Sequence, residues 1–124
     1  QFKFANIDEL LADLISHKPD NKVKINYHCT GDPSKVDDDT AYQLYRITQE
    51  ALSNVITHSG ATHANVSLTI DSKIHLQITD NGTFTADTEG IGIHSMNDRA
   101  ESIQAKFSLT TKPGQTTIDI IRNA

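Results

Sequence analysis

The chain has 124 residues, of which 36% are hydrophobic and 22% are charged, and its formal net charge is −5. This composition is typical of one soluble globular domain and not of a disordered chain. Because the sequence has no basic block and no long apolar run, it predicts neither nucleic-acid binding nor a membrane span nor a secretory signal. The single cysteine, Cys29, excludes an internal disulfide and a CxxC zinc motif, and it favours a reduced, cytoplasmic setting.

The first thirty residues predict a helix and a strand. Asn6 can cap the helix, with Glu9 three residues later, and apolar residues follow at helical spacing as far as Ile15. Turn-forming residues at 19–21 end this helix. Polar and apolar side chains then alternate over 22–27, which is typical of a half-buried strand.

A long amphipathic helix is expected next. Either Asp38 or Asp39 could cap it, and Ser59-Gly60 is typical of a helix end. Its apolar positions recur at spacings of three and four, which gives one stripe that can be buried. Beside the stripe lies a row of polar residues that are each four positions apart, namely Arg46, Glu50, Asn54 and His58. This row predicts either ligands for a cation or a phosphate, or simply a solvated helix face.

The second half of the chain predicts a hairpin, a helix and another hairpin. Residues 66–70 and 74–78 alternate as two paired strands, and residues 81–90 show no periodicity and predict a loop. A helix is expected to begin near Gly92, and two strands joined by a turn at 112–115 complete the chain. The sequence therefore predicts a two-layer α/β sandwich of the α+β class, with three helices on one face of a mixed, mostly antiparallel sheet of about five strands.

Three polar features point to one nucleotide site. Asp80 continues the alternation of its strand on the side that faces the helices, where a carboxylate is unfavourable unless donors reach it. Such an acceptor suits the exocyclic amine of adenine. The oxygen of Asn54 suits Mg²⁺, and the helix N-terminus near Gly92 suits phosphates. The residues therefore predict a Mg–ATP site, although the chain contains no GxxxxGK[ST] motif and no complete GxGxxG motif.

Four segments carry a more specific pattern: QEALSN at 49–54, DNG at 80–82, GIGI at 90–93 and GQTT at 114–117. In this order and spacing they resemble the ATP-binding catalytic domain of sensor histidine kinases, in the superfamily that includes gyrase B and heat-shock chaperone ATPases. More narrowly, they resemble the nitrate-sensor and hexose-phosphate-sensor type. The resemblance covers nearly the whole chain, and we interpret residues 1–124 as one domain excised from a longer chain.

The resemblance implies a role for each candidate residue. Glu50 would be the catalytic base that orients water, Asn54 would coordinate Mg²⁺, and Asp80 would bind the adenine amine. The other nucleotide-binding positions that it implies are His58, Gly82, Gly90, Gly92, Ile93, Thr116 and Thr117. In this family the two glycines at 90 and 92 would bracket a lid over the phosphates, and one of the two threonines would support the adenine-binding carboxylate.

The function that the resemblance implies is transfer of the γ-phosphoryl group of ATP to a histidine on a separate dimerisation domain, in two-component signal transduction. The partners would be that phosphoacceptor domain and then a response regulator. The chain would be a cytoplasmic domain and, where the whole protein is an inner-membrane sensor, upstream segments alone would reach the membrane. None of the six histidines is followed by Asp or Glu, so the isolated chain is not expected to phosphorylate itself.

Two alternative functions are compatible with the sequence. Phe84 stands where the family commonly has a glycine, and the loop at 83–89 is short. These departures are consistent with a degenerate nucleotide-binding scaffold that has little turnover. The second alternative is a protein-serine kinase of the anti-sigma type, which shares the superfamily.

Overall fold

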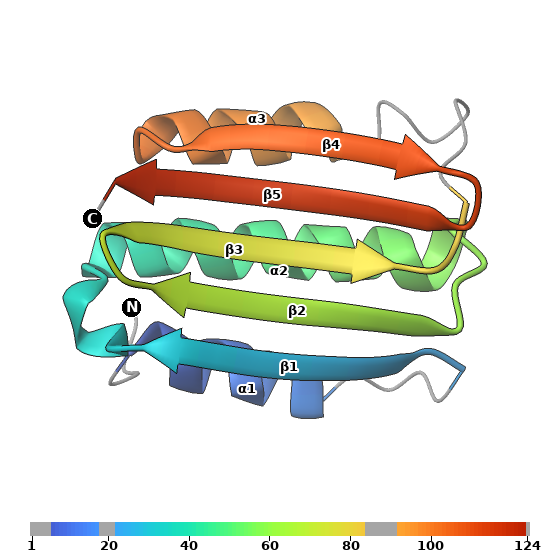
Figure 1. Ribbon diagram of the computed structural model, residues 1–124, viewed down its shortest axis with the longest axis horizontal. Coiled ribbons are helices and arrows are strands. Elements are labelled where there is room, and N and C mark those ends of the chain that lie inside the picture. Colours follow the sequence, from blue (N-terminus) through green and yellow to red (C-terminus); the bar gives the residue numbers. More distant parts are fainter. Residues whose placement is uncertain (1–5, 18–21, 84–91, 124) are drawn as a thin grey trace.

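The computed structural model describes residues 6–17, 22–83 and 92–123. Figure 1 shows a sheet of long strands with the helices on the side behind it. In chain order the elements are α1 (Ile7–Ser16), β1 (Lys24–Gly31), the 3₁₀ turn η1 (Pro33–Lys35), α2 (Asp38–His58), β2 (His63–Ile70), β3 (Lys73–Asp80), α3 (Ile93–Ser102), β4 (Lys106–Lys112) and β5 (Gln115–Asn123).

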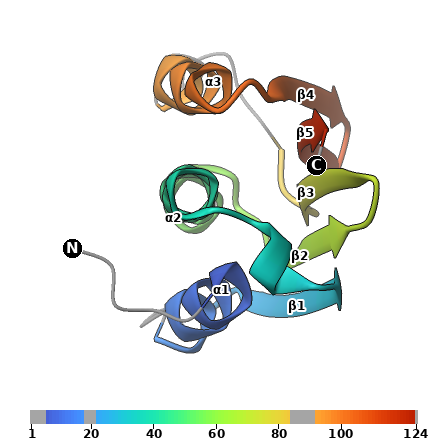
Figure 2. The same cartoon turned by 90° about the vertical axis from the view of Figure 1, so that its left-hand side faces the viewer.

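The described strands form one five-stranded sheet in the order β1-β2-β3-β5-β4. β1 pairs with β2 in parallel, and the other three pairs are antiparallel. Viewed along the sheet, α1, α2 and α3 all lie on the same face (Figure 2). The predicted α+β sandwich with a mixed, mostly antiparallel sheet is therefore confirmed.

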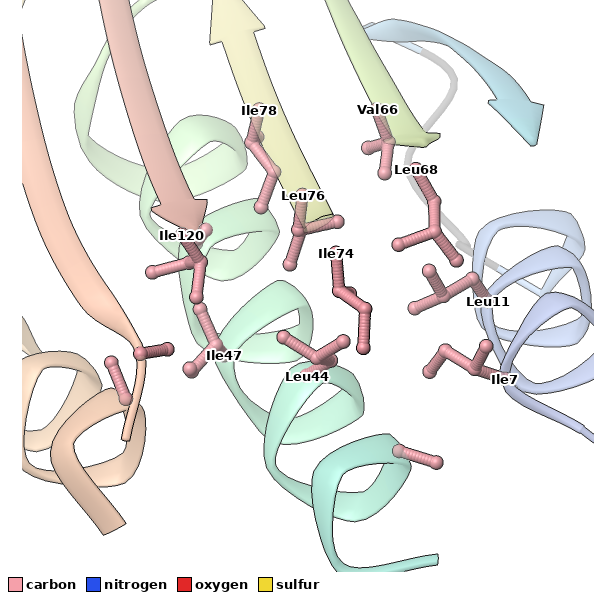
Figure 3. Packing of buried hydrophobic residues seen from close by; sticks show 14 of the residues in the cluster. Ile7, Leu11, Leu44, Ile47, Val66, Leu68, Ile74, Leu76, Ile78 and Ile120 are labelled. Atoms are coloured by element: carbon pink, nitrogen blue, oxygen red, sulfur yellow. The ribbon is translucent and has the colours of Figure 1, made fainter. Parts of the chain in front are cut away.

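The core lies between the helices and the sheet. Figure 3 shows labelled side chains from α1, α2, β2, β3 and β5 pointing into this space. The alternating burial along β2 and β3 produces this arrangement, because every second side chain of a strand faces the same side of the sheet. The labelled members of the cluster are Ile7, Leu11, Leu44, Ile47, Val66, Leu68, Ile74, Leu76, Ile78 and Ile120.

The N-terminus of α2 differs from the prediction. Asp37 caps this helix, since its Oδ1 accepts a hydrogen bond from the Thr40 backbone N–H at 2.8 Å. The expectation that Asp38 or Asp39 caps it was wrong, because both lie in the first helical turn. Val36, one residue before the cap, is buried in the core cluster and fixes where the chain enters the helix. The hydrogen bonds from Thr40 hold the pKa of Asp37 below its ordinary value.

Candidate nucleotide site

Asp80 ends β3 on the face that the helices cover, as its place in the alternation predicts. It is 6% exposed, and its Oδ1 accepts a hydrogen bond from the Gly82 backbone N–H at 2.8 Å. Burial raises the pKa of the Asp80 carboxyl, and the hydrogen bond from Gly82 acts in the opposite direction. The fold therefore holds a carboxylate in an environment that favours a ligand able to donate to it.

Thr116 lies directly opposite Asp80 in the register between β3 and β5. It is also 6% exposed, and its buried Oγ1 has no hydrogen-bond partner among the described residues. Thr117 alternates to the other face of the sheet, where it lines a surface hollow with Thr110, Lys112 and Gln115. Of the two predicted threonines, the structure thus brings only Thr116 to Asp80.

An open pocket lies beside Asp80, between the sheet and the helices α2 and α3. Its lining is Ala51, Asn54, Val55, Ser59, Ile78, Asp80, Thr83, Ile93, Met96, Leu109, Thr116 and Ile118. Most of these side chains are apolar, and Asp80 is the one carboxylate among them. Such a pocket fits a flat heterocycle that carries an amine. The apolar walls formed by Leu109 and Ile118 were not assigned to the site from the sequence, because they come from strands that meet Asp80 only in the folded sheet.

A second part of the site lies where α2 meets the N-terminus of α3. Gly92 is the residue before α3, with φ of 79°, and no side chain caps this helix end. A Cβ atom on Gly92 would lie 2.9 Å from Glu50 Oε2 and 3.4 Å from Asn54 Nδ2. The structure therefore brings together three of the predicted residues that come from segments about 40 positions apart, which the sequence alone could not place in contact.

The polar side chains at this second part of the site are suited to Mg²⁺. Glu50 Oε2 is buried and has no hydrogen-bond partner among the described residues. The described part of the chain contains no group of three or more His, Cys, Asp or Glu side chains that could hold a metal by themselves. One or two oxygen ligands completed by phosphates and water are the usual arrangement for Mg²⁺ in nucleotide sites. The Glu50 carboxylate and the Asn54 amide fit that arrangement.

The remaining candidates have varied positions. Ile93 lines the pocket, and Gly82 is buried so close to the end of α2 that a Cβ atom on it would lie 2.5 Å from the Ser59 carbonyl oxygen. Arg99, on α3, donates from its Nη1 to Gln43 Oε1 on α2 at 3.0 Å. The predictions for Gly90, for Phe84 and for most of the lid lie outside the described residues, as does the side chain of His58.

The fold corresponds to a known class of domain. The ATP-binding domain of PrrB from Mycobacterium tuberculosis superposes with a TM-score of 0.72 over 97% of this chain and 96% of that domain, at 17% sequence identity. The chain therefore has the fold of a histidine kinase ATP-binding domain. No helix in the described part of the chain is long and apolar enough to cross a membrane.

Sequence relatives point to the same class. The chain is 47% identical over 69 residues to the sensor histidine kinase YxjM of Bacillus subtilis and 39% identical over 79 residues to the sensor protein VraS of Staphylococcus aureus. These matches cover 54% and 60% of this chain but only 16% and 23% of the two relatives. No protein-family model matches the chain. The sequence is thus similar to sensor histidine kinases, and the narrower nitrate-sensor or hexose-phosphate-sensor type stays a prediction.

Proposed function

We propose that this chain binds Mg–ATP and donates its γ-phosphoryl group to a histidine on a separate dimerisation domain. The observation that carries the proposal is Asp80, a buried carboxylate in a mostly apolar pocket, with the Thr116 hydroxyl, which has no hydrogen-bond partner among the described residues, opposite it. Similarity to sensor histidine kinases supports the kinase class. A buried carboxylate with a single backbone donor and a buried hydroxyl without a partner are both unfavourable, and a ligand that hydrogen-bonds to them removes that cost.

Adenine is the base that fits the proposal. Its exocyclic amine donates to the Asp80 carboxylate, and the neighbouring Thr116 hydroxyl provides a second polar group for the base or for a bridging water. The apolar walls from Ile78, Ile93 and Met96 pack against the faces of the ring. Guanine, which has a carbonyl oxygen where adenine has the amine, would place an acceptor against an acceptor.

The phosphates would extend from the pocket toward Glu50, Asn54 and the N-terminus of α3. The backbone N–H groups at this helix end bind phosphate oxygens, and the helix dipole favours their negative charge. Asn54, with Glu50 beside it, would hold Mg²⁺, which neutralises charge on the phosphates when it is bound. Glu50, whose Oε2 lies beside Gly92 at the start of α3, would act as the base that orients an attacking group near the γ-phosphate.

The proposed partners follow from the reaction. Phosphoryl transfer requires an acceptor in line with the γ-phosphate, and a histidine on a dimerisation domain would provide it before a response regulator receives the group. In the whole protein the chain would then work as a cytoplasmic domain, with any membrane contact made by other segments.

Calorimetric titration of the chain with ADP, in the presence and absence of Mg²⁺, tests the proposal. Saturable binding of one ADP per chain that tightens with Mg²⁺ is expected. Absence of ADP binding would contradict the proposal. If ADP binds but a separately expressed dimerisation segment is never labelled from ATP, the degenerate scaffold becomes the better description.

A further inference from the structure

We infer that Asn81 is a positioning residue that sets the preference of the site for adenine over guanine. The inference rests on the proposed function and adds Asn81, a residue to which that function assigns no role. Asn81 follows Asp80 directly, but its side chain binds the connection between α2 and β2 and does not line the pocket. Its effect on a nucleotide would therefore pass through the orientation of Asp80.

The Asn81 side chain uses both ends of its amide. Oδ1 accepts from the backbone N–H groups of Thr62 at 2.9 Å and of His63 at 3.0 Å, and Nδ2 donates to Thr62 Oγ1 at 2.9 Å. The backbone N–H of Asn81 also donates to the His63 carbonyl at 3.1 Å. Four hydrogen bonds therefore attach this one residue to the start of β2, and together they define which way the amide points.

The other end of the same turn is attached to the same connection. The Thr83 backbone N–H donates to the Ser59 carbonyl at 2.9 Å, and Gly82 lies so close to Ser59 that it has no room for a Cβ atom. Gly82 in turn donates its backbone N–H to Asp80 Oδ1 at 2.8 Å. The turn at 80–83 is thus held on both sides, and the Asp80 carboxylate is oriented from within it.

The hydrogen bonds of Asn81 affect how well the Asp80 carboxylate can bind the amine of adenine. Hydrogen bonds weaken steeply when their angle or distance departs from the optimum. If the Asn81 side chain is removed, one side of the turn loses three hydrogen bonds, and the Asp80 carboxylate is no longer held toward the amine. GDP offers no amine at that position, so its binding depends much less on where the carboxylate points. Loss of Asn81 should therefore weaken ADP binding more than GDP binding, so the ratio of the two affinities should fall.

The test measures the dissociation constants of ADP and GDP with Mg²⁺ by calorimetry, for the wild-type chain and three variants. Asn81→Ala should lower the preference for ADP over GDP about tenfold, as expected for lost hydrogen bonds that orient a buried acceptor. Asn81→Asp should keep the preference within about threefold of wild type, because a carboxylate still accepts from the two backbone N–H groups. Asn65→Ala is the matched control. This asparagine lies on β2, and among the described residues its side chain accepts one 3.4 Å hydrogen bond, from Asn26, so the preference should not change.

Each other outcome has a definite meaning. An equal loss of ADP and GDP affinity in Asn81→Ala, with an unchanged ratio, would show a merely structural role and overturn the inference. An unchanged ratio with unchanged affinities would overturn it as well. Absence of ADP binding to the wild-type chain would overturn the proposed function and this inference together. If Asn81→Ala does not fold, Thr62→Val removes the hydroxyl that accepts from Asn81 Nδ2, together with its hydrogen bond to His63 Nδ1, and a drop in the ADP preference of about threefold is expected. No drop there would reject the inference.

Discussion

Asp80 is the residue at which stability and binding oppose each other. Its carboxylate is buried without a cationic partner, which suits a donor ligand but disfavours the empty fold. Asp80→Asn should leave the fold intact, because the amide oxygen still accepts from Gly82. It should weaken ADP binding about tenfold or more, since an N–H group can then face the adenine amine. Calorimetry with ADP measures the loss, and unchanged affinity in the folded variant would remove Asp80 from the site.

The same substitution should change stability with pH in a defined direction. Burial raises the pKa of Asp80 in the folded state above its ordinary value of 3.8. The folded state then holds its proton more strongly than the unfolded state, so the wild-type chain loses stability as pH rises from that value through the raised pKa. Asp80→Asn lacks this loss. Thermal unfolding without nucleotide should show the variant gaining stability relative to wild type from acid to neutral pH, and a gain that shrinks with rising pH would contradict the assignment.

Asn54 should govern the response to Mg²⁺. It lies next to Gly92 and one helical turn after Glu50, in the part of the site assigned to the phosphates. Because Mg²⁺ in nucleotide sites has few protein ligands, Asn54→Ala should abolish most of the effect of Mg²⁺ on ATP binding. Titration of Mg²⁺ at fixed ATP, in wild type and variant, measures this. Matching Mg²⁺ curves would show that the ligand assignment is wrong.

At the scale of the elements, the capping of α2 by Asp37 can be tested by comparing substitutions of Asp37 and of its neighbour Asp38. Asp37→Ala should lower the free energy of unfolding by about 1 kcal/mol, whereas Asp38→Ala should cost only a few tenths through the helix dipole. The lowered pKa of Asp37 means that its contribution is present above its ordinary pKa and is lost as pH falls through the folded value. Urea unfolding at neutral and acid pH measures both effects. Equal losses for the two variants at neutral pH would contradict the capping assignment.

The sequence predicted most of these elements, and the failures have identifiable causes. Strand alternation was sufficient to place Asp80 on the buried face, because that inference needs only local periodicity. The cap of α2 was misplaced because Asp37, Asp38 and Asp39 have the same capping chemistry, and only the folded chain shows that the Thr40 N–H donates to Asp37 Oδ1. The role of Asn81 was missed since its partners are 18 and 19 residues away and meet it only through the register of β2 and β3.

For the whole molecule, we expect the chain to bind ATP without phosphorylating itself. No histidine is among the described residues that line the nucleotide pocket. His75, for example, is held on β3 by a hydrogen bond from its Nε2 to Asp119 Oδ1 at 2.7 Å. Because phosphoryl transfer depends on an acceptor held in line, only slow hydrolysis remains possible in the isolated chain.

Incubation with γ-labelled ATP and Mg²⁺ measures this, with acid and base treatment to identify phosphohistidine. A separately expressed dimerisation segment should become labelled when the chain is added, and the chain itself should not. The Asp80→Asn chain is the matched control and should label that segment more slowly at low ATP. Stoichiometric acid-labile label on the isolated wild-type chain would show that the acceptor lies within it.

Because β3 lies in the middle of the sheet, the backbone around Asp80 should open less readily than the backbone at the start of α3. β3 has hydrogen-bonded neighbours on both sides, β2 and β5, and Asp80 is its last residue. Amide hydrogens in such a strand exchange with solvent only when the sheet as a whole opens. Those at the start of α3, before the first hydrogen bond from the Met96 N–H to the Gly92 carbonyl, have no partner within the helix and can exchange without any opening of the sheet. In deuterated solvent the amide hydrogens around Asp80 should therefore stay protected long after those at the start of α3 have exchanged, so a bound nucleotide would lose its phosphate contacts before its base contacts.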